Sequence, residues 1–350
     1  MALWVACVLA PTAAIGQDAP VVPSMSHPIV IAHRGASGFR PGNTLAAYDR
    51  AISYGTDFIE LDLVLTKDNV FVARHENEVS QTTDVAQHPE FAVRKTTKIV
   101  DGESHTGWFT EDFTLAELKT LRVKERLPQL RPRNTRYDGQ FDVPTLAEII
   151  ALVKQRSNEL HRTIGIYAEL KHSSYFASIG LPMEAKLAAE FKAAGWDKPH
   201  DPVFIQSFEV NNLKELHKLT GLRLIQLLEA KGGPADHAQP SYAAMTNAAG
   251  LREIATYAWG IAPNKALIQD GERMPTALVI DAHAAGLRVH PWTFRLENTF
   301  LPKSFRIGDD PAGRGHLDLE IRRFMDLGVD GFITDDPGVA VRERNQMMKR

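Results

Sequence analysis

Short apolar runs and segments of helical periodicity alternate along most of this chain. The first run, Ile29 to Ala32, is β-branched and short enough for a strand buried on both faces, and it stops at the polar tripeptide His33-Arg34-Gly35. Apolar residues then recur at helical spacing from Leu45 to Gly55, and a second apolar run follows from Phe58 to Leu65. The pattern predicts a strand, a loop, a helix and a second strand, with polar chemistry beginning where the first strand ends.

Regular alternation of strands and helices resumes at Val143 and continues to the C-terminus. Eight strands are predicted in all, beginning at Ile29, Phe58, Thr163, Val203, Leu222, Ala258, Arg288 and Gly331. The helices predicted in this second part run over 145–157, 183–194, 210–219, 251–257, 276–285 and 317–327, with a last one from Val339. Eight strands, each followed by a helix or an irregular crossover, favour an α/β fold of the (β/α)8 TIM-barrel type over an open sheet.

A polar, turn-rich stretch from Glu76 to Asp142 interrupts this alternation. Within it, Thr114 and Glu117 form a capping-box pattern that predicts one short helix over Leu115 to Leu121. A loop of this length inside a compact domain is usually functional or a small subdomain of its own. We therefore expect an insertion subdomain over 76–142, after the second strand region of the barrel.

Two carboxylates, Glu60 and Asp62, lie two residues apart in the second predicted strand and so project from the same side of it. Such a pair is self-repelling and costly to desolvate unless something positive neutralises it. Glu169 closes the third strand, and the C-terminal ends of barrel strands gather at one face. Three hard oxygen donors suit Ca2+ or Mg2+ better than zinc. The alternative is that these acids are ordinary strand carboxylates paired with Arg34 and Lys171.

Two histidines bracket the acidic pair in the sequence. His33 follows the first strand, and His75 follows a short apolar run that ends at Ala73. Because the ordinary pKa of an imidazole is about 6.5, two such groups can serve as acid and base near neutral pH. Arg34 adds a permanently charged fork suited to phosphate oxygens. Taken one at a time, either histidine could equally be structural.

Three further residues at strand ends each have two interpretations. Phe208 and Trp292 could line the alcohol side of a pocket, or they could simply be packing residues. Asp335 could belong to a turn that opens the last helix, or it could orient a catalytic group. The remaining histidines near strand ends carry no functional prediction from sequence: His172, His283, His290 and His316.

The combination of these pieces is specific, although each piece alone is weak. His33-Arg34-Gly35, then Asn43-Thr44 opening a helix, then Glu60-Leu61-Asp62 on a strand and a histidine some dozen residues later, resembles the signature of the glycerophosphodiester phosphodiesterases. The likeness extends from Pro28 to the C-terminus. Around Ile164 to Lys171 the chain looks most similar to the periplasmic bacterial branch of that family.

The resemblance implies hydrolysis of glycerophosphodiesters, the deacylated phospholipids, to sn-glycerol 3-phosphate and an alcohol. It implies a TIM barrel with an insertion beside the substrate mouth and a divalent cation, Ca2+ ahead of Mg2+. By this likeness the matching site residues have three roles: His33 and His75 catalytic, Arg34 and Lys171 phosphate-binding, and Glu60, Asp62 and Glu169 metal-binding. The sequence leaves the acid and base roles of the two histidines open, and also the choice between a cyclic-phosphate route and direct attack by water.

Two positions depart from the family pattern. The chain has Pro41-Gly42-Asn43-Thr44 where the family often has Pro-Glu-Asn-Thr, which puts the rigidity of this loop in doubt. Glu76 stands where an aspartate is frequent after the second histidine, which is a milder change.

Composition fits a soluble globular protein, and the small-molecule substrate follows from the family resemblance alone. The 350 residues are 44% hydrophobic and 24% charged, and the net charge of −3 argues against a nucleic-acid-binding surface. Residues 2–15 are apolar apart from Pro11 and Thr12, which matches a secretory h-region and is too short to span a bilayer. We expect a signal peptide over 1–16, a linker over 17–27 and the barrel over 28–350. That organisation predicts a periplasmic or secreted protein without stable membrane insertion.

Two other functions compete with this interpretation. A phospholipase-like relative acting on lysophospholipids or phosphoinositides calls for an apolar rim, and 76–142 shows no strong amphipathic stripe. A secreted binding protein that has lost catalysis is disfavoured because all the matching site residues are intact. The sequence leaves the head-group preference and the oligomeric state open.

Overall fold

The computed structural model describes residues 27–349. The signal peptide expected over 1–16 lies outside the described residues, as does the linker over 17–27 apart from His27. Within residues 27–349, no helix combines the length and apolar character needed to cross a membrane.

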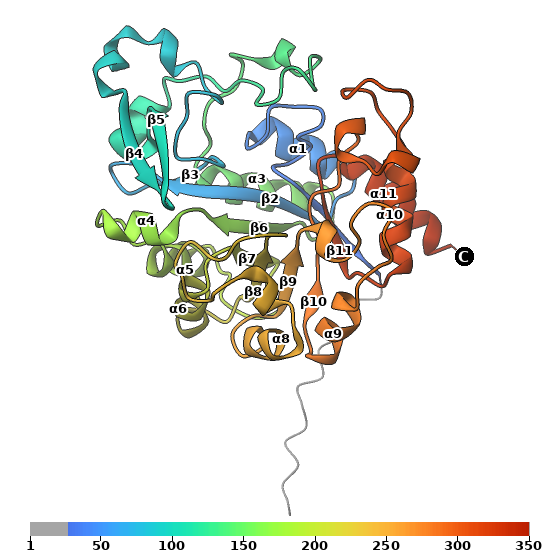
Figure 1. The fold of residues 1–350 in the computed structure, drawn as a ribbon. Coiled ribbons are helices and arrows are strands. Elements are labelled where there is room, and N and C mark those ends of the chain that lie inside the picture. The colour runs from blue at the N-terminus through green and yellow to red at the C-terminus, as the bar shows by residue number, and fades with distance from the viewer. Residues whose placement is uncertain (1–26, 350) are drawn as a thin grey trace, which may run out of the picture.

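A ring of parallel strands forms the centre of the molecule (Figure 1). Each strand pairs with its neighbour in chain order, and β1 pairs with both β2 and β11. Backbone hydrogen bonds join the remaining edge, because Asp330 N donates to Val289 O and Ile333 N donates to Pro291 O. The predicted (β/α)8 TIM barrel is therefore confirmed. Its strands are β1 (Ile29–Ala32), β2 (Phe58–Leu65), β6 (Gly165–Leu170), β7 (Val203–Ser207), β8 (Arg223–Leu228), β9 (Gly260–Pro263), β10 (Arg288–Val289) and β11 (Gly331–Thr334).

Helices surround this ring and cover the outer face of the strands (Figure 1). Local signals fix where several of them begin. The hydroxyl of Thr44 accepts a hydrogen bond from Ala47 N at the start of α1, and Thr145 and Glu148 form a reciprocal capping box on α3. The outer helices are α1 (Leu45–Ser53), α3 (Leu146–Glu159), α5 (Glu184–Ala193), α6 (Asn211–Leu219), α8 (Ala248–Ile254), α9 (Leu278–Ala284), α10 (Leu317–Asp326) and α11 (Pro337–Met347).

The barrel interior changes from apolar to polar along the strands. Near their start the inward side chains form a small apolar cluster that includes Ile31, Phe58 and Tyr167. Gly165 leaves room for it, since an added Cβ would lie 2.1 Å from the ring of Phe58. Two and four residues after Phe58, the same inward row carries Glu60 and Asp62. The acidic side chains therefore lie directly above the apolar filling of the barrel.

The predicted insertion over 76–142 covers one side of the barrel mouth (Figure 1). It follows the short antiparallel strand β3 (Phe71–Ala73) and contains a hairpin, β4 (Thr96–Val100) and β5 (Glu103–Gly107). The hairpin was not predicted, because its strands are mostly exposed and lack apolar alternation. Its helix α2 (Leu115–Leu118) has the expected capping box but ends three residues earlier than predicted.

Two strands differ in extent from the prediction. The strand predicted over 288–292 pairs regularly only at Arg288 and Val289, and Pro291 has no N–H to donate to a ladder. The strand predicted over 258–261 lies at 260–263, where Gly260 allows close approach because an added Cβ would meet Arg288 O at 2.6 Å. Two short helices were not predicted, α4 (Ser173–Ser178) and α7 (Tyr242–Met245). Short 3-10 helices complete the described chain: η1 (Val85–Gln87), η2 (Pro89–Arg94), η3 (Thr110–Asp112), η4 (Thr135–Tyr137), η5 (Lys265–Leu267), η6 (Asn298–Phe300) and η7 (Lys303–Phe305).

Candidate active site

Three buried carboxylates meet at the C-terminal ends of β2 and β6. Asp62 and Glu169 are register partners on these neighbouring strands, and Glu60 lies one inward position before Asp62. One oxygen of each carboxylate lies within 4.8 Å of an oxygen of the other two. The three acids proposed from sequence therefore form one cluster with the spacing of a cation site.

The negative charge and the oxygen atoms of the three carboxylates are not fully compensated by neighbouring groups. Burial, Asp62 and Glu169 raise the pKa of Glu60 well above its usual range, and burial raises the pKa of Glu169 to about 7. Burial also tends to raise the pKa of Asp62, but Arg34, His75, Lys171 and His33 together outweigh it, and the net direction is downward. Within residues 27–349, Asp62 Oδ1 and Gln206 Oε1 are buried without a hydrogen-bond partner. Unpartnered oxygens among three hard donors fit a divalent cation of the Ca2+ or Mg2+ type.

Arg34 lies against this cluster at the end of β1. Its backbone N donates to Glu60 Oε2 at 2.7 Å, and its Nε lies 3.1 Å from Asp62 Oδ2 as an ion pair. Asn43 donates to the same Asp62 oxygen at 2.7 Å, and the hydroxyl of Tyr48 in turn donates to Asn43 Oδ1. The Asn-Thr element of the motif thus orients the carboxylate of Asp62.

The loop with the unusual glycine packs tightly on Arg34. An added Cβ at Gly42 would lie 3.1 Å from the Cβ of Arg34, so a side chain there requires its neighbours to shift. Asn43 N donates to Arg34 O, and an Arg74 guanidinium N–H donates to Asn43 O at 2.8 Å. These backbone bonds hold the loop without the glutamate that the family often has.

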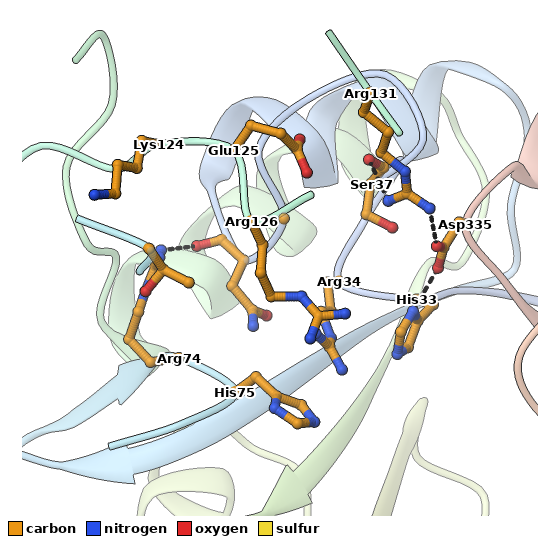
Figure 2. A pocket seen from close by; sticks show the side chains of 13 residues that line it. His33, Arg34, Ser37, Arg74, His75, Lys124, Glu125, Arg126, Arg131 and Asp335 are labelled. Atoms are coloured by element: carbon orange, nitrogen blue, oxygen red, sulfur yellow. Dashed lines mark hydrogen bonds and ion pairs between the residues drawn. The ribbon is translucent and has the colours of Figure 1, made fainter. Parts of the chain in front are cut away.

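His33 is oriented by Asp335, which follows β11. Their side chains are joined by a short contact of 2.5 Å between Nδ1 and Oδ1, and the other oxygen of Asp335 is paired with Arg131 and with Arg295 at 3.1 Å. Burial, reinforced by Arg34, lowers the pKa of His33 to about 4. Asp335 keeps a pKa well below its usual range despite burial, because Arg131, His33 and Arg295 surround it. Figure 2 shows this chain from Arg131 through Asp335 to His33.

His75 follows β3 and has a different support. Its Nδ1 is bonded to Glu76, and its Nε2 lies 3.3 Å from the ammonium of Lys171. The second oxygen of Glu76 lies 3.5 Å from Nε2 of His172, whose Nδ1 is bonded to Asp101 at 2.6 Å. Burial, then Arg34 and Lys171, lower the pKa of His75 to about 3.

Sequence reasoning gave His172 no role, and the structure places it in this chain of contacts. Burial tends to lower its pKa, but hydrogen bonds to Asp101 and Glu76 raise it to about 9. Asp101 lies in the turn of the β4–β5 hairpin, so this chain links the insertion to His75.

A cavity of about 320 Å³ lies between His33 and His75, and both side chains line it. Lys171 enters it with its ammonium 2.9 Å from Glu169 Oε1. Phe208 and Trp292 also line it, with ring centroids 5.6 Å apart and the rings edge to face, so the pocket-lining interpretation of these aromatics holds. Asp62 lies beneath the cavity. The other six residues proposed from sequence all line it, namely His33, Arg34, Glu60, His75, Glu169 and Lys171.

Comparison with known proteins decides the family. The model of the glycerophosphoryl diester phosphodiesterase family matches residues 33–339. The chain belongs to this family. Glycerophosphodiester phosphodiesterase GDPD6 of Arabidopsis thaliana is 37% identical over 330 residues, which cover 89% of this chain and 85% of the relative. A glycerophosphodiester phosphodiesterase of Bacillus subtilis (strain 168) is 32% identical over 316 residues, covering 88% and 84%. The resemblance to this family and the class of phosphoric diester hydrolase are thereby confirmed, and the likeness to its periplasmic bacterial branch stays a prediction.

Solved structures show the same fold. A phosphodiesterase of Oleispira antarctica in complex with the product sn-glycerol-3-phosphate has a TM-score of 0.60 at 22% identity, covering 91% of this chain and 97% of that chain. A glycerophosphodiester phosphodiesterase of Agrobacterium tumefaciens str. C58 has a TM-score of 0.57 at 21% identity, covering 89% and 99%. At this identity the likeness supports the barrel.

Several residues of this phosphodiesterase that shape the site were missed or left open by sequence reasoning. Asp335 could be placed at the end of the eighth strand, but its partners Arg131 and Arg295 could not. Arg126 and Arg131 belong to a run of basic residues in the insertion that reads only as turn-rich. The available signal was that this polar insertion carries four arginines within residues 126–136.

Proposed function

We propose that this phosphodiesterase hydrolyses glycerophosphodiesters to sn-glycerol 3-phosphate and an alcohol, with His33 and His75 as general acid and base and a divalent cation held by Glu60, Asp62 and Glu169. The observation that carries the proposal is the convergence on one cavity of two imidazoles, two cationic side chains and two carboxylates, which form a cluster with the third carboxylate, Asp62. The sn-glycerol-3-phosphate bound to the Oleispira antarctica enzyme supports the choice of product.

The donor set supports Ca2+ first and Mg2+ second. Three carboxylates offer only oxygen, and Ca2+ tolerates irregular oxygen arrangements better than Mg2+ does. When bound, the cation polarises a phosphate oxygen and lowers the pKa of a coordinated hydroxyl or water. Glu60, Asp62 and Glu169 would hold the cation in their ionised forms.

Arg34 and Lys171 would bind the non-bridging phosphate oxygens. Both are buried cations that face the cavity, so they remain desolvated when substrate enters. Charge-assisted hydrogen bonds from fixed donors stabilise the negative charge that grows on the phosphoryl group in the transition state.

The two imidazoles would carry the protons. In the free enzyme both pKa values are low, so both rings are neutral at pH 7 and either can accept the proton of the attacking hydroxyl or water. The negative charge of a bound phosphodiester raises the pKa of the nearby imidazoles, which favours a protonated ring that can donate to the leaving alkoxide. As the phosphorus–oxygen bond to the alcohol breaks, one histidine has gained a proton and the other has lost one.

The test is release of sn-glycerol 3-phosphate from glycerophosphocholine by the parent, His33→Ala and His75→Ala. Each variant should lose about 10²- to 10⁴-fold in kcat, since general acid–base groups contribute on that scale. His105→Ala is the control, because His105 is half-exposed on β5 and its ion-pair partner is Glu103 at 4.0 Å. Full activity of both site variants contradicts the proposal.

A second assay separates the two nucleophiles. If the glycerol 2-hydroxyl attacks, a cyclic phosphate forms first and a substrate lacking that hydroxyl is not hydrolysed. If water attacks directly, the deoxy substrate is hydrolysed at a comparable rate. The same assay with lysophosphatidylcholine tests the phospholipase-like alternative, for which the described insertion offers few exposed large apolar side chains, among them Val93 and Ile99.

Export of the protein is a separate proposal. It rests on the uncharged apolar segment over 2–15, which has the length of a signal h-region. Fractionation of cells expressing the full chain should place the activity outside the cytoplasm, and N-terminal sequencing should find the mature chain beginning near Gln17. Activity confined to the cytoplasm with an intact Met1 contradicts it.

A further inference from the structure

An arginine of the insertion, Arg126, projects into the catalytic cavity. Its side chain lines that cavity and the two hollows that adjoin it. Figure 2 shows it extending from the insertion toward Arg34. Among residues 27–349 it has no hydrogen bond or ion pair, whereas Arg34, Arg131 and Arg295 are each paired with a carboxylate. A cation directed into an enzyme cavity without an anion is available for the substrate.

The backbone around Arg126 is firmly held. Glu125 N donates to Asp138 Oδ1 at 2.7 Å, and the two oxygens of Glu125 accept from Asn134 Nδ2 and from Leu127 N. These bonds fix the residues on either side of Arg126 while its own guanidinium remains free. The hydrogen bonds of the insertion therefore fix where the charge of Arg126 lies relative to the cavity.

Among the charged groups that act on the Arg126 guanidinium, Arg34 and Arg295 outweigh the carboxylates Asp335 and Asp62. Burial, then Arg34 and Arg295, lower the pKa of Arg126 to about 10. Placing a partly desolvated cation beside like charges is unfavourable unless an anion joins them. Both histidines and two carboxylates of the acidic cluster line the cavity that these side chains share. The anion that would join the three arginines is therefore the phosphate group of the substrate.

We propose that Arg126 is a catalytic residue that binds the phosphoryl group and balances its second negative charge; this inference rests on the function proposed above. Three carboxylates, a divalent cation, Arg34 and Lys171 together leave one positive charge, which matches a phosphodiester. When the nucleophile's oxygen bonds to phosphorus and the alcohol leaves, the transition state and the monoester product each carry up to two negative charges. Arg126 supplies the additional positive charge.

The experiment compares the Ca2+-loaded parent with Arg126→Gln, Arg126→Lys and the control Arg133→Gln. Arg133 is an exposed arginine of the same insertion and lies outside the catalytic cavity. Because Arg133→Gln also replaces one arginine by glutamine, it has the same net charge as Arg126→Gln. Readouts are kcat and KM for glycerophosphocholine and the Kd of sn-glycerol 3-phosphate by calorimetry at pH 8 and pH 5. The product is a dianion at pH 8 and mainly a monoanion at pH 5, since the second pKa of a phosphate monoester is about 6.

For Arg126→Gln we expect kcat to fall by about 10- to 100-fold and KM to change by less than about threefold. Product Kd should weaken about tenfold at pH 8 and much less at pH 5, because the lost contact serves the second charge. The lysine variant should recover part of both losses, and the Arg133 control should match the parent.

The inference is overturned if Arg126→Gln keeps the parent's kcat and its product Kd at pH 8, or if Arg133→Gln shows the same losses. A failure of the proposed function looks different, because the parent itself then releases no sn-glycerol 3-phosphate from glycerophosphocholine. An active parent with an unaffected Arg126→Gln removes only the role of Arg126.

Discussion

The two histidines of the cavity have the same chemistry but very different supports. The partner of His33 is Asp335, whose side chain is 4% exposed and paired with Arg131 and Arg295. The partner of His75 is Glu76, whose side chain is 46% exposed and continues to His172. One imidazole is fixed by a buried charge network at the closure of the barrel, and the other by a chain of contacts at its open rim.

The difference predicts unequal sensitivity. A buried carboxylate between cations cannot be replaced without leaving those cations unpaired, whereas water can substitute for part of a half-exposed contact. The His33 side should therefore lose both activity and stability when its partner is changed. The His75 side should lose some activity and little stability.

Of the variants that test this difference, Asp335→Asn should cause the largest losses of activity and stability. The amide cannot hold His33 as the carboxylate does, and it leaves Arg131 and Arg295 with one ion-pair partner fewer. We expect kcat to fall by about 10²- to 10³-fold, by analogy with carboxylates that orient catalytic histidines. The free energy of unfolding should fall by about 3 kcal/mol, as for other broken buried pairs. Steady-state assays and urea unfolding measure the two, and a loss below threefold in kcat would show that Asp335 does not orient His33.

Glu76→Gln should have a smaller effect, confined to activity. We expect kcat to fall by about tenfold, because His75 keeps its place but loses a charged partner. The free energy of unfolding should change by less than about 1 kcal/mol, since the carboxylate is half-exposed. Glu103→Gln is the matched control on β5. Equal losses from Glu76→Gln and Asp335→Asn would contradict the asymmetry between the two sides.

In the cation-free protein, acid pH should remove the stability that the buried neutral histidines contribute, whereas Glu60 and Glu169, whose pKa values are raised, contribute a pH dependence of opposite sign. Burial lowers the pKa of His33 and of His290 to about 4 in the folded protein, against about 6.5 in the unfolded chain. Between these values an unfolded-chain histidine binds more protons than the folded one, so the histidine contribution to the free energy of unfolding is full above pH 6.5 and falls toward pH 4. Each histidine contributes a slope of up to about 1.4 kcal/mol per pH unit.

Urea unfolding from pH 7 to pH 4 measures this slope. His290 lies in the barrel interior against Tyr167, Phe204 and Trp259, so His290→Gln should lower the slope of the unfolding free energy against pH. The same variant should leave the pH dependence due to His33 in place. A pH dependence of the unfolding free energy that is the same in His290→Gln as in the parent contradicts the predicted shift of His290.

The barrel and the centre of its site were predictable because they depend on local patterns. Strand burial appears as short β-branched runs such as Ile29 to Ala32, and a period of two places Glu60 and Asp62 on one face. The strand order then brings Glu169 beside Asp62 without any further information, because adjacent parallel strands end at the same level.

The supports of the site were not predictable from local patterns. Arg131 meets Asp335 across 204 residues of sequence, and Asp101 meets His172 across 71. Such contacts depend on how the insertion folds over the barrel mouth, and its exposed hairpin carries little apolar periodicity. Polar insertion residues therefore had to be found in space rather than in the sequence.

The central claim is that the acidic cluster between His33 and His75 holds a divalent cation. Calorimetric titration of Ca2+ into EDTA-treated protein, with Mg2+ in a parallel run, tests it most directly. The account predicts one bound cation per parent chain and none in Asp62→Asn, which nearly keeps the shape of the side chain but removes a ligand charge. A parent that binds neither cation, or a variant that binds like the parent, contradicts it.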